Sequence, residues 1–138
     1  MTFEVTFEPE LPDHLAVSPP KEVDWGFAYG AADGQPDYNL RYVICGTLVC
    51  YYPASLATLL NDLLGELEAL ESGLVHNVSM SGYTLLLAEI AGDKVTFRDP
   101  WPDGDVVGEV PVADVHAVLQ NASARLWGHL KALRTATP

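Results

Sequence analysis

A proline-rich stretch in the second half of the chain combines residue types that are common at protein-binding surfaces. It has the sequence Asp-Pro-Trp-Pro-Asp-Gly-Asp and contains Asp99, Trp101, Asp103 and Asp105. An indole is a frequent anchor in protein interfaces, and prolines lower the conformational entropy that a loop loses on binding. Carboxylates around such an anchor favour a positively charged partner. We therefore predict that these residues, together with Glu109, bind a basic protein partner.

The same stretch admits two other interpretations. As a calcium loop it lacks the regular spacing of acidic ligands, the glycine at the sharp turn and the final bidentate glutamate. A calcium site is therefore not expected. The plainer alternative is a rigid turn in which the Trp101 ring covers the hydrophobic core.

The histidines and cysteines give no sign of a metal site. The four histidines are His14, His76, His116 and His129. No two of them have the i, i+4 spacing typical of zinc ligands on a helix, and the sequence has no Cys-x-x-Cys pair. We therefore predict no metal ion and no cofactor.

Nucleophilic catalysis by a thiol would have to use Cys45 or Cys50. Both lie in a largely apolar stretch, and burial in apolar surroundings makes a thiol unreactive. The alternative, a catalytic cysteine, requires the His76 imidazole within hydrogen-bonding distance. The sequence also lacks a Gly-x-Ser-x-Gly elbow, a Walker loop and a dinucleotide-binding glycine motif. We therefore predict no catalytic residue and a protein that is not an enzyme.

Aromatic residues raise a second functional hypothesis. Trp25, Phe27 and Tyr29 occur at alternate positions, as on one face of a strand. Such a stripe is more typical of core packing than of a ligand site. The alternative is a pocket between the sheet and the helices, as in a small-ligand-binding sensor or an enzyme. Its lining would consist of Trp25, Tyr29, Tyr42 and His76.

Composition indicates one folded domain over residues 1–138. Hydrophobic residues make up 49% of the chain and charged residues 19%, a balance typical of a globular domain rather than a disordered chain. A chain of this length is expected to form one hydrophobic core. The charge-free run from Tyr42 to Asn61 contains polar residues, glycine and proline. It therefore predicts a buried strand and a helix rather than a membrane span.

The chain is strongly acidic, with 19 Asp and Glu against 7 Lys and Arg and a formal net charge of −12. Such a field repels nucleic acid and anionic membrane surfaces, and it attracts basic proteins. A plainer alternative is that the acidity serves solubility or reflects a salt-adapted proteome. No basic region typical of a signal peptide precedes the first hydrophobic residues, so we expect a cytoplasmic protein.

A leucine-rich helix is the clearest element that the sequence predicts. Leucines between residues 56 and 70 follow the i, i+3, i+4, i+7 spacing of an amphipathic helix. Ser55 suits the N-terminal cap and Gly73 the left-handed residue after the C-terminus. Its acidic residues are expected on the solvated face, namely Glu66, Glu68 and Glu71.

A second helix is expected to begin at Pro111 and to carry an apolar stripe from Val115 to Leu133. The remaining apolar segments are short, alternate with turn residues and predict strands. The predicted strands span residues 3–8, 22–29, 39–51, 74–80, 83–90, 94–98 and 106–110.

This order predicts an α+β fold, in which two helices pack on one face of a mostly antiparallel sheet. The leucine helix, the Glu71-Ser72-Gly73 sequence after it, the strands from Tyr83 to Arg98 and the closing helix resemble small bacterial proteins of the polymorphic-toxin immunity type. The resemblance implies a stable acidic protein that blocks the active site of a cognate toxin and performs no chemistry. It rests on generic periodicity and assigns a role to no single residue.

Charge, motif content and this resemblance lead to one functional hypothesis. We expect a non-enzymatic binding protein of the immunity or inhibitor type. It would neutralise a basic protein partner, such as a cognate toxin, through an acidic surface that contains aromatic residues. Neither nucleic acid nor a membrane is an expected partner. The alternatives are the small-ligand sensor or enzyme and a homodimeric structural subunit.

Overall fold

The protein contains two antiparallel sheets, and helices pack against both of them. The computed structural model describes residues 3–73, 76–80, 83–98 and 105–136, with side chains except at 49–52, 76–80, 83–86 and 136. The first elements are β1 (Phe3–Glu8), the 3-10 helix η1 (Asp13–Leu15), α1 (Trp25–Ala32), β2 (Tyr38–Ile44), β3 (Thr47–Ala54) and α2 (Leu56–Ser72). They are followed by β4 (His76–Met80), β5 (Tyr83–Ala91), β6 (Lys94–Arg98), β7 (Val106–Pro111) and α3 (Val112–Ala136).

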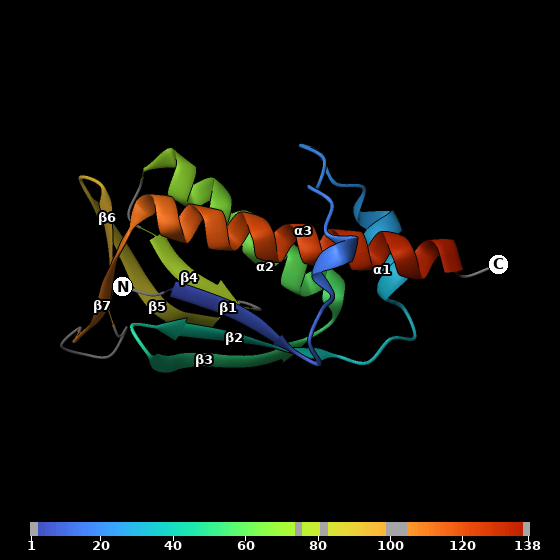
Figure 1. Ribbon diagram of the computed structural model, residues 1–138, viewed down its shortest axis with the longest axis horizontal. Helices are drawn as coiled ribbons and strands as arrows, with labels where there is room; N and C mark the ends of the chain where they lie inside the picture. The colour runs from blue at the N-terminus through green and yellow to red at the C-terminus, as the bar shows by residue number, and fades with distance from the viewer. Residues whose placement is uncertain (1–2, 74–75, 81–82, 99–104, 137–138) are drawn as a thin grey trace.

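The strands form a three-stranded sheet, β1-β2-β3, and a four-stranded sheet, β4-β5-β6-β7. All described strand pairs are antiparallel. Figure 1 shows α2 and α3 lying above β1, β2 and β3. The predicted α+β class with antiparallel strand pairing is therefore confirmed. The strands form two sheets where one is predicted, and the described residues form three α-helices where two are predicted.

Aromatic packing joins the two sheets. The predicted strand over residues 3–8 is confirmed as β1, which alternates between buried and exposed residues, so Phe3, Val5 and Phe7 face the core. The Phe3 ring stacks on that of Phe97 in β6, with ring centroids 5.5 Å apart and an interplanar angle of 2°. The Phe3 ring also contacts Tyr42 in β2, with centroids 5.7 Å apart. One core therefore lies between both sheets and the helices.

α2 forms where the leucine spacing predicts it. The Ser55 hydroxyl oxygen accepts a hydrogen bond from the Thr58 backbone N–H at 3.2 Å, and Gly73 adopts the left-handed conformation with φ of 71°. Most of the leucines are buried against the core. Glu66 is also buried, with 7% of its surface exposed, so its predicted place on the solvated face is wrong, whereas Glu68 and Glu71 are exposed as predicted.

Residues 25–32 form a helix, so the predicted strand over residues 22–29 is wrong. The Asp24 carboxylate caps α1 by accepting a hydrogen bond from the Phe27 backbone N–H at 3.1 Å. The buried positions Ala28, Ala31 and Ala32 have helical spacing. A short helix that is apolar on most sides has no clear periodicity, so its alternating aromatic residues imitate a strand.

A hairpin replaces the single long strand predicted over residues 39–51. β2 and β3 are joined by Cys45-Gly46, whose φ angles are 50° and 83°. Positive φ at both positions is typical of the type I′ turn, which matches the twist of a hairpin. Cys45 is exposed in this turn, so the prediction that it is buried in a strand is wrong. The Cys50 side chain lies outside the described residues.

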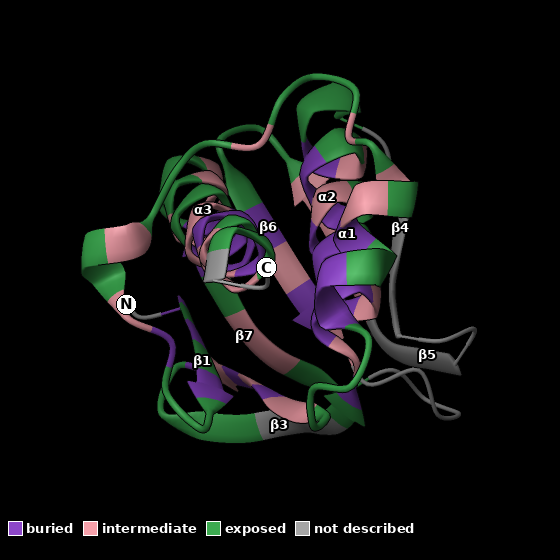
Figure 2. Cartoon of the chain, turned by 90° about the vertical axis from the view of Figure 1, so that its right-hand side faces the viewer, coloured by how far each residue is buried: buried purple, intermediate pink, exposed green. Residues whose placement is uncertain are grey.

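α3 confirms the second predicted helix and runs along the whole molecule (Figure 1), about 37 Å for 25 residues. It contacts α1, α2, η1 and strands of both sheets. Figure 2 shows it nearly end-on, with β1 and β7 on one side and α1 and α2 on the other. Its buried residues are Val115, Leu119, Ala122, Ser123, Leu126, Trp127 and Leu130.

A connection between η1 and α1 crosses over α3 (Figure 2); we call residues 16–24 the strap. The Val17 backbone N–H donates a hydrogen bond to the Ala124 carbonyl of α3 at 3.1 Å. Gly128 of α3 packs against the backbone at the junction of η1 and the strap. An added Cβ at this position would overlap the Leu15 carbonyl oxygen. The backbone of the η1–strap junction therefore packs on the bare backbone of α3.

The Gly128→Ala substitution should lower the free energy of unfolding by about 1–3 kcal/mol, because the methyl group displaces the backbone at Leu15. Gly65→Ala is the matched control in α2, where an added Cβ meets nothing within 4 Å. It should stabilise the protein by about 0.5–1 kcal/mol, the usual gain of alanine over glycine in a helix. Chemical denaturation measures both values, and an equal gain in both variants would contradict the close packing at Gly128.

Burial changes the acid–base behaviour of His129 in α3. Its ring packs against Tyr38 with centroids 6.0 Å apart, and its Nδ1 is buried without a hydrogen-bond partner among the described residues. Burial lowers the pKa of His129 because the charged imidazolium is poorly solvated there. The unfolded chain therefore binds this proton more readily. The stability from the neutral ring is complete above the unfolded pKa and is lost as pH falls through the folded pKa.

The His129→Phe variant keeps an aromatic ring beside Tyr38 and removes this titration. Its melting temperature should therefore fall less than that of the wild type between about pH 7.5 and about pH 5.5. Calorimetry at both pH values measures the difference. Identical acid sensitivity of His129→Phe and the wild type would contradict the argument.

Candidate functional site

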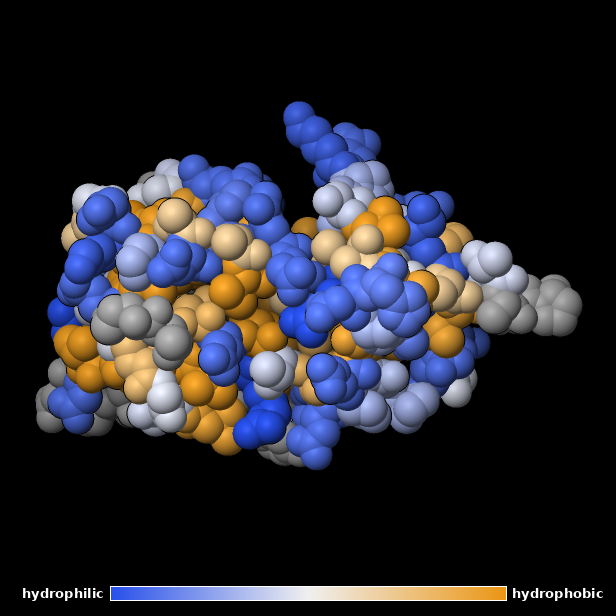
Figure 3. Space-filling view, in the orientation of Figure 1, coloured by the Kyte–Doolittle hydropathy of each residue, from blue (hydrophilic) through white to orange (hydrophobic). Residues whose placement is uncertain are grey.

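A groove of about 900 Å³ lies between α2, α3 and the strap. Figure 3 shows the strap projecting above the body of the molecule, with a notch beside it. The strap contributes Ser18, Pro19, Pro20, Lys21 and Glu22, and α2 contributes Leu64, Leu67, Glu68 and Glu71. The lining residues from α3 are Ala117, Gln120, Asn121, Ser123 and Ala124.

The apolar part of the groove follows from the width of the leucine stripe on α2. Leu67 is almost completely buried, whereas Leu64 is half-buried at the edge of the stripe. α3 places Ala117 and Ala124 opposite, and alanine has no side-chain atoms beyond Cβ. These short side chains leave the space between the two helices open. The groove therefore combines apolar lining with access from solvent.

Ser123 is the buried polar residue of the groove. Its side chain is fully buried, and its hydroxyl oxygen forms no hydrogen bond within the described part of the chain. A buried hydroxyl without a partner costs stability, about 1–3 kcal/mol by comparison with a hydrogen-bonded one.

Carboxylates outnumber cations along the groove. Glu22, Glu68 and Glu71 line it, and the Lys21 ammonium is the one Lys or Arg group among its lining residues. The Glu71 carboxylate lies 3.0 Å from the His116 imidazole Nε2, so it already has a partner. The side chains of Glu22 and Glu68 are exposed and form no ion pair with other described residues. The groove therefore favours a cationic ligand.

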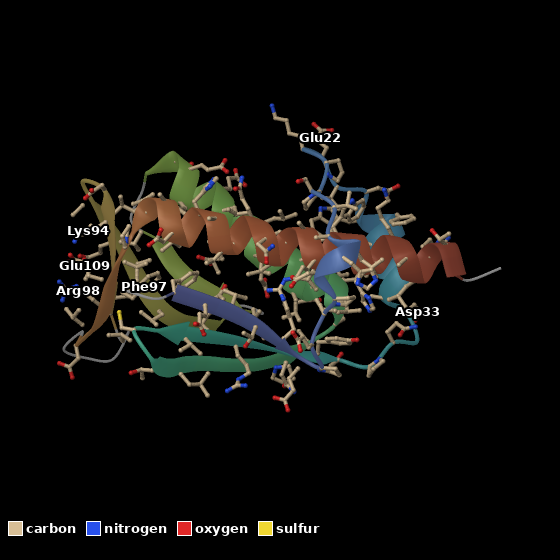
Figure 4. The ribbon with its side chains drawn as sticks, viewed as in Figure 1. Glu22, Asp33, Lys94, Phe97, Arg98 and Glu109 are labelled. Atoms are coloured by element: carbon tan, nitrogen blue, oxygen red, sulfur yellow. The ribbon has the colours of Figure 1, made fainter. Side chains whose placement is uncertain are left out.

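Two cationic side chains form ion pairs on another part of the molecule. Lys94 pairs with Glu109 at 3.5 Å between β6 and β7, and Arg98 pairs with Glu89 at 3.5 Å between β6 and β5. Figure 4 shows Lys94, Arg98 and Glu109 together at one end of the molecule, away from Glu22 on the projecting strap. Glu109, a predicted partner-binding residue, is thus already in an ion pair.

The other predicted partner-binding residues are placed only in part. Asp105 is exposed immediately before β7. Asp99, Trp101 and Asp103 lie outside the described residues, so their role stays a prediction.

The four residues of the predicted alternative pocket are placed only in part. Trp25 and Tyr29 contact each other on α1, with ring centroids 6.2 Å apart, and Tyr29 is 46% exposed. Tyr42 is buried in β2 on the core side of its sheet. Neither the groove nor the inner cavity described next is lined by Trp25 or Tyr29. His76 lies in β4, and its side chain is outside the described set.

A second hollow lies inside the core and is too small for an organic ligand. Its volume is about 10 Å³, close to the least that a single water molecule occupies. Buried Glu66 and Tyr42 both line it. The remaining lining residues are Phe3, Leu70, Val95, Phe97, Val115 and Leu119. Ligand binding is therefore expected at the groove rather than at this cavity.

Metal-binding groups and membrane-spanning helices also bear on function. The described residues contain no group of three or more His, Cys, Asp and Glu side chains arranged to hold a metal ion. Within the same ranges, none of the helices combines the length and the apolarity that a membrane crossing requires.

Comparisons with protein-family models, curated proteins and solved structures gave no match. Geometry and charge of the chain itself therefore indicate its function.

The groove is a site that sequence analysis does not predict. Glu68 and Glu71 are expected on an exposed helix face, but nothing in the periodicity shows that α3 and the strap approach that face. One usable signal is the run of short residues from Ala122 to Ala124 within the second predicted helix, because small residues permit close approach. The partner that approaches them is a tertiary feature.

The Ser123→Ala substitution should raise the free energy of unfolding by up to about 1 kcal/mol, because it removes a buried hydroxyl without a partner. Ser55→Ala is the matched control, since that hydroxyl caps α2. Its loss should cost about 1 kcal/mol. Urea denaturation of both variants measures the two opposite shifts, and a destabilised Ser123→Ala would show that the hydroxyl is satisfied in the free protein.

Proposed function

We propose that the protein is a non-enzymatic binding protein of the immunity or inhibitor type, which captures a basic protein partner with its acidic surface. The groove between α2, α3 and the strap is the observation that supports this most directly. It offers apolar lining together with three carboxylates and one ammonium. A surface of this kind fits a partner that presents apolar and positively charged side chains together.

The charge of the whole chain acts in the same direction. A formal net charge of −12 steers positively charged proteins toward the surface and raises their association rate. Exposed Asp105 adds to this field at the start of β7. The predicted recognition stretch around Trp101 would supply a second, aromatic contact.

Inhibition by such a protein requires no chemistry. A rigid acidic surface that covers a basic active site excludes the substrate by occupying its space. Buried apolar contacts then slow dissociation of the complex, while charge mainly affects how fast it forms. This is the mode of action that the resemblance to immunity-type proteins implies.

Selection of random peptides displayed on phage tests the proposal. The enriched sequences should contain Lys and Arg beside Leu, Ile or Phe. The affinity of the best peptide should fall at least about tenfold between 0.1 M and 1 M salt, because the Debye length falls from about 10 Å to about 3 Å. Isothermal titration calorimetry measures the affinity at each salt concentration.

The control is the same peptide with each Lys and Arg replaced by Glu, which should not bind. Enrichment of sequences without positive charge, or an affinity that does not respond to salt, would show that the acidic surface is not a binding surface for basic proteins.

A further inference from the structure

We infer that the groove between α2, α3 and the strap holds one segment of the partner, in which Lys or Arg side chains stand beside apolar ones. This inference rests on the proposed function and gives it a location. It assigns Glu22 and Glu68 to the cationic side chains, the Leu64 edge to the apolar ones, and Ser123 to the peptide backbone.

The size and openness of the groove suit a peptide segment. Its volume of about 900 Å³ lies at the upper end of the usual range for ligand sites, about 300–1,000 Å³. It is bounded by two helices and a loop, and it is open along one side (Figure 3). Short Ala117 and Ala124 side chains on α3 allow a backbone to approach closely.

Charge defines the occupant. Glu22 on the strap and Glu68 on α2 approach the same groove from two separate elements, and neither is engaged in an ion pair with other described residues. Figure 4 shows Glu22 at the outer tip of the strap. A guanidinium or ammonium group beside either carboxylate would gain a charge-assisted contact. An anionic segment would be repelled by both.

Ser123 provides an independent indication of a ligand. Ser123 is among the residues that line the groove, its side chain is fully buried, and its hydroxyl has no hydrogen-bond partner among the described residues. Buried hydroxyl groups are normally satisfied, so an orphaned one in a hollow is unusual. Rotation of the Ser123 side chain toward the groove would let a backbone group of the bound segment complete the hydrogen bond.

The strap gives the groove a fixed wall. Its first part is attached to α3 by the hydrogen bond from the Val17 N–H to the Ala124 carbonyl, at 3.1 Å. Pro19 and Pro20 follow within the lining, and proline restricts the backbone of the free protein. Less conformational entropy is therefore lost when a segment binds against this wall.

Paired charge reversals locate the binding site. Glu22→Lys with Glu68→Lys changes the groove, and Glu4→Lys with Glu8→Lys changes the exposed face of β1. Each pair adds four units to the net charge of −12, so the overall field is matched. The best phage-selected peptide should bind the groove variant at least about tenfold more weakly and the β1 variant less than about threefold more weakly. Calorimetry and circular dichroism measure affinity and folding.

Two variants test the inference without a change of charge. Ala117→Trp, at an exposed position in α3, fills the groove and should reduce peptide affinity at least about tenfold. Ser123→Ala should reduce affinity about threefold to tenfold, although the free protein should be at least as stable as the wild type. Opposite effects on binding and stability distinguish a ligand contact from a structural role.

Equal losses in the two charge-reversal variants, or full affinity in Ala117→Trp, would overturn the groove as the site and leave the proposed function standing. Failure of every basic peptide to bind the wild type would instead reject the proposed function. A small molecule that occupies the groove while the peptide still binds would also overturn the inference.

Discussion

Burial of the apolar face of α3 is the constraint on which the remaining structure depends. The helix is too long to be covered by one neighbour, so α1, α2, η1 and strands of both sheets each cover part of it. Phe27 and Trp127 pack at the α1 end, with ring centroids 5.7 Å apart. Near the other end, Val115 and Leu119 close the inner cavity against both sheets. The two sheets thus share one core because both pack against this helix.

The same constraint explains why the groove exists. η1 and the first part of the strap are held on α3 by backbone contacts at Gly128 and Ala124 and by the Arg125–Asp13 ion pair at 3.5 Å. α2 packs on α3 through its leucines. Between these two attachments α3 presents alanine, serine and short polar residues, which do not fill the space. The groove therefore lies where α2 and the strap no longer pack directly against α3, and these elements form its walls.

Local sequence patterns correctly predicted the elements that bury one face. They failed for segments that are apolar on most sides. The one-sided leucine stripe of α2, the alternation of β1 and the strands of the second sheet were predictable for this reason. α1 is apolar on most sides, so its alternating aromatic residues gave a false strand signal. The β2–β3 turn at Cys45-Gly46 lies within an apolar run and gave no turn signal. The groove was not predictable, since it depends on which surface of α2 the strap and α3 approach. Glu68 and Glu71 were predicted to be exposed, but not to line a groove with Glu22.

The placement of the cations explains how an acidic chain keeps an unneutralised groove. Arg125 is bound by Asp13, the Val5 carbonyl at 3.2 Å and the Phe7 ring at 5.3 Å. Arg134 lies over the Phe27 ring at 6.0 Å. In the four-stranded sheet, Lys94 pairs with Glu109 and Arg98 pairs with Glu89. These four positively charged side chains therefore interact with other residues of the chain and connect its structural elements. Lys21 is the one Lys or Arg residue that lines the groove with Glu22 and Glu68. A cationic ligand that also covers the apolar lining would therefore replace solvent ions around these carboxylates.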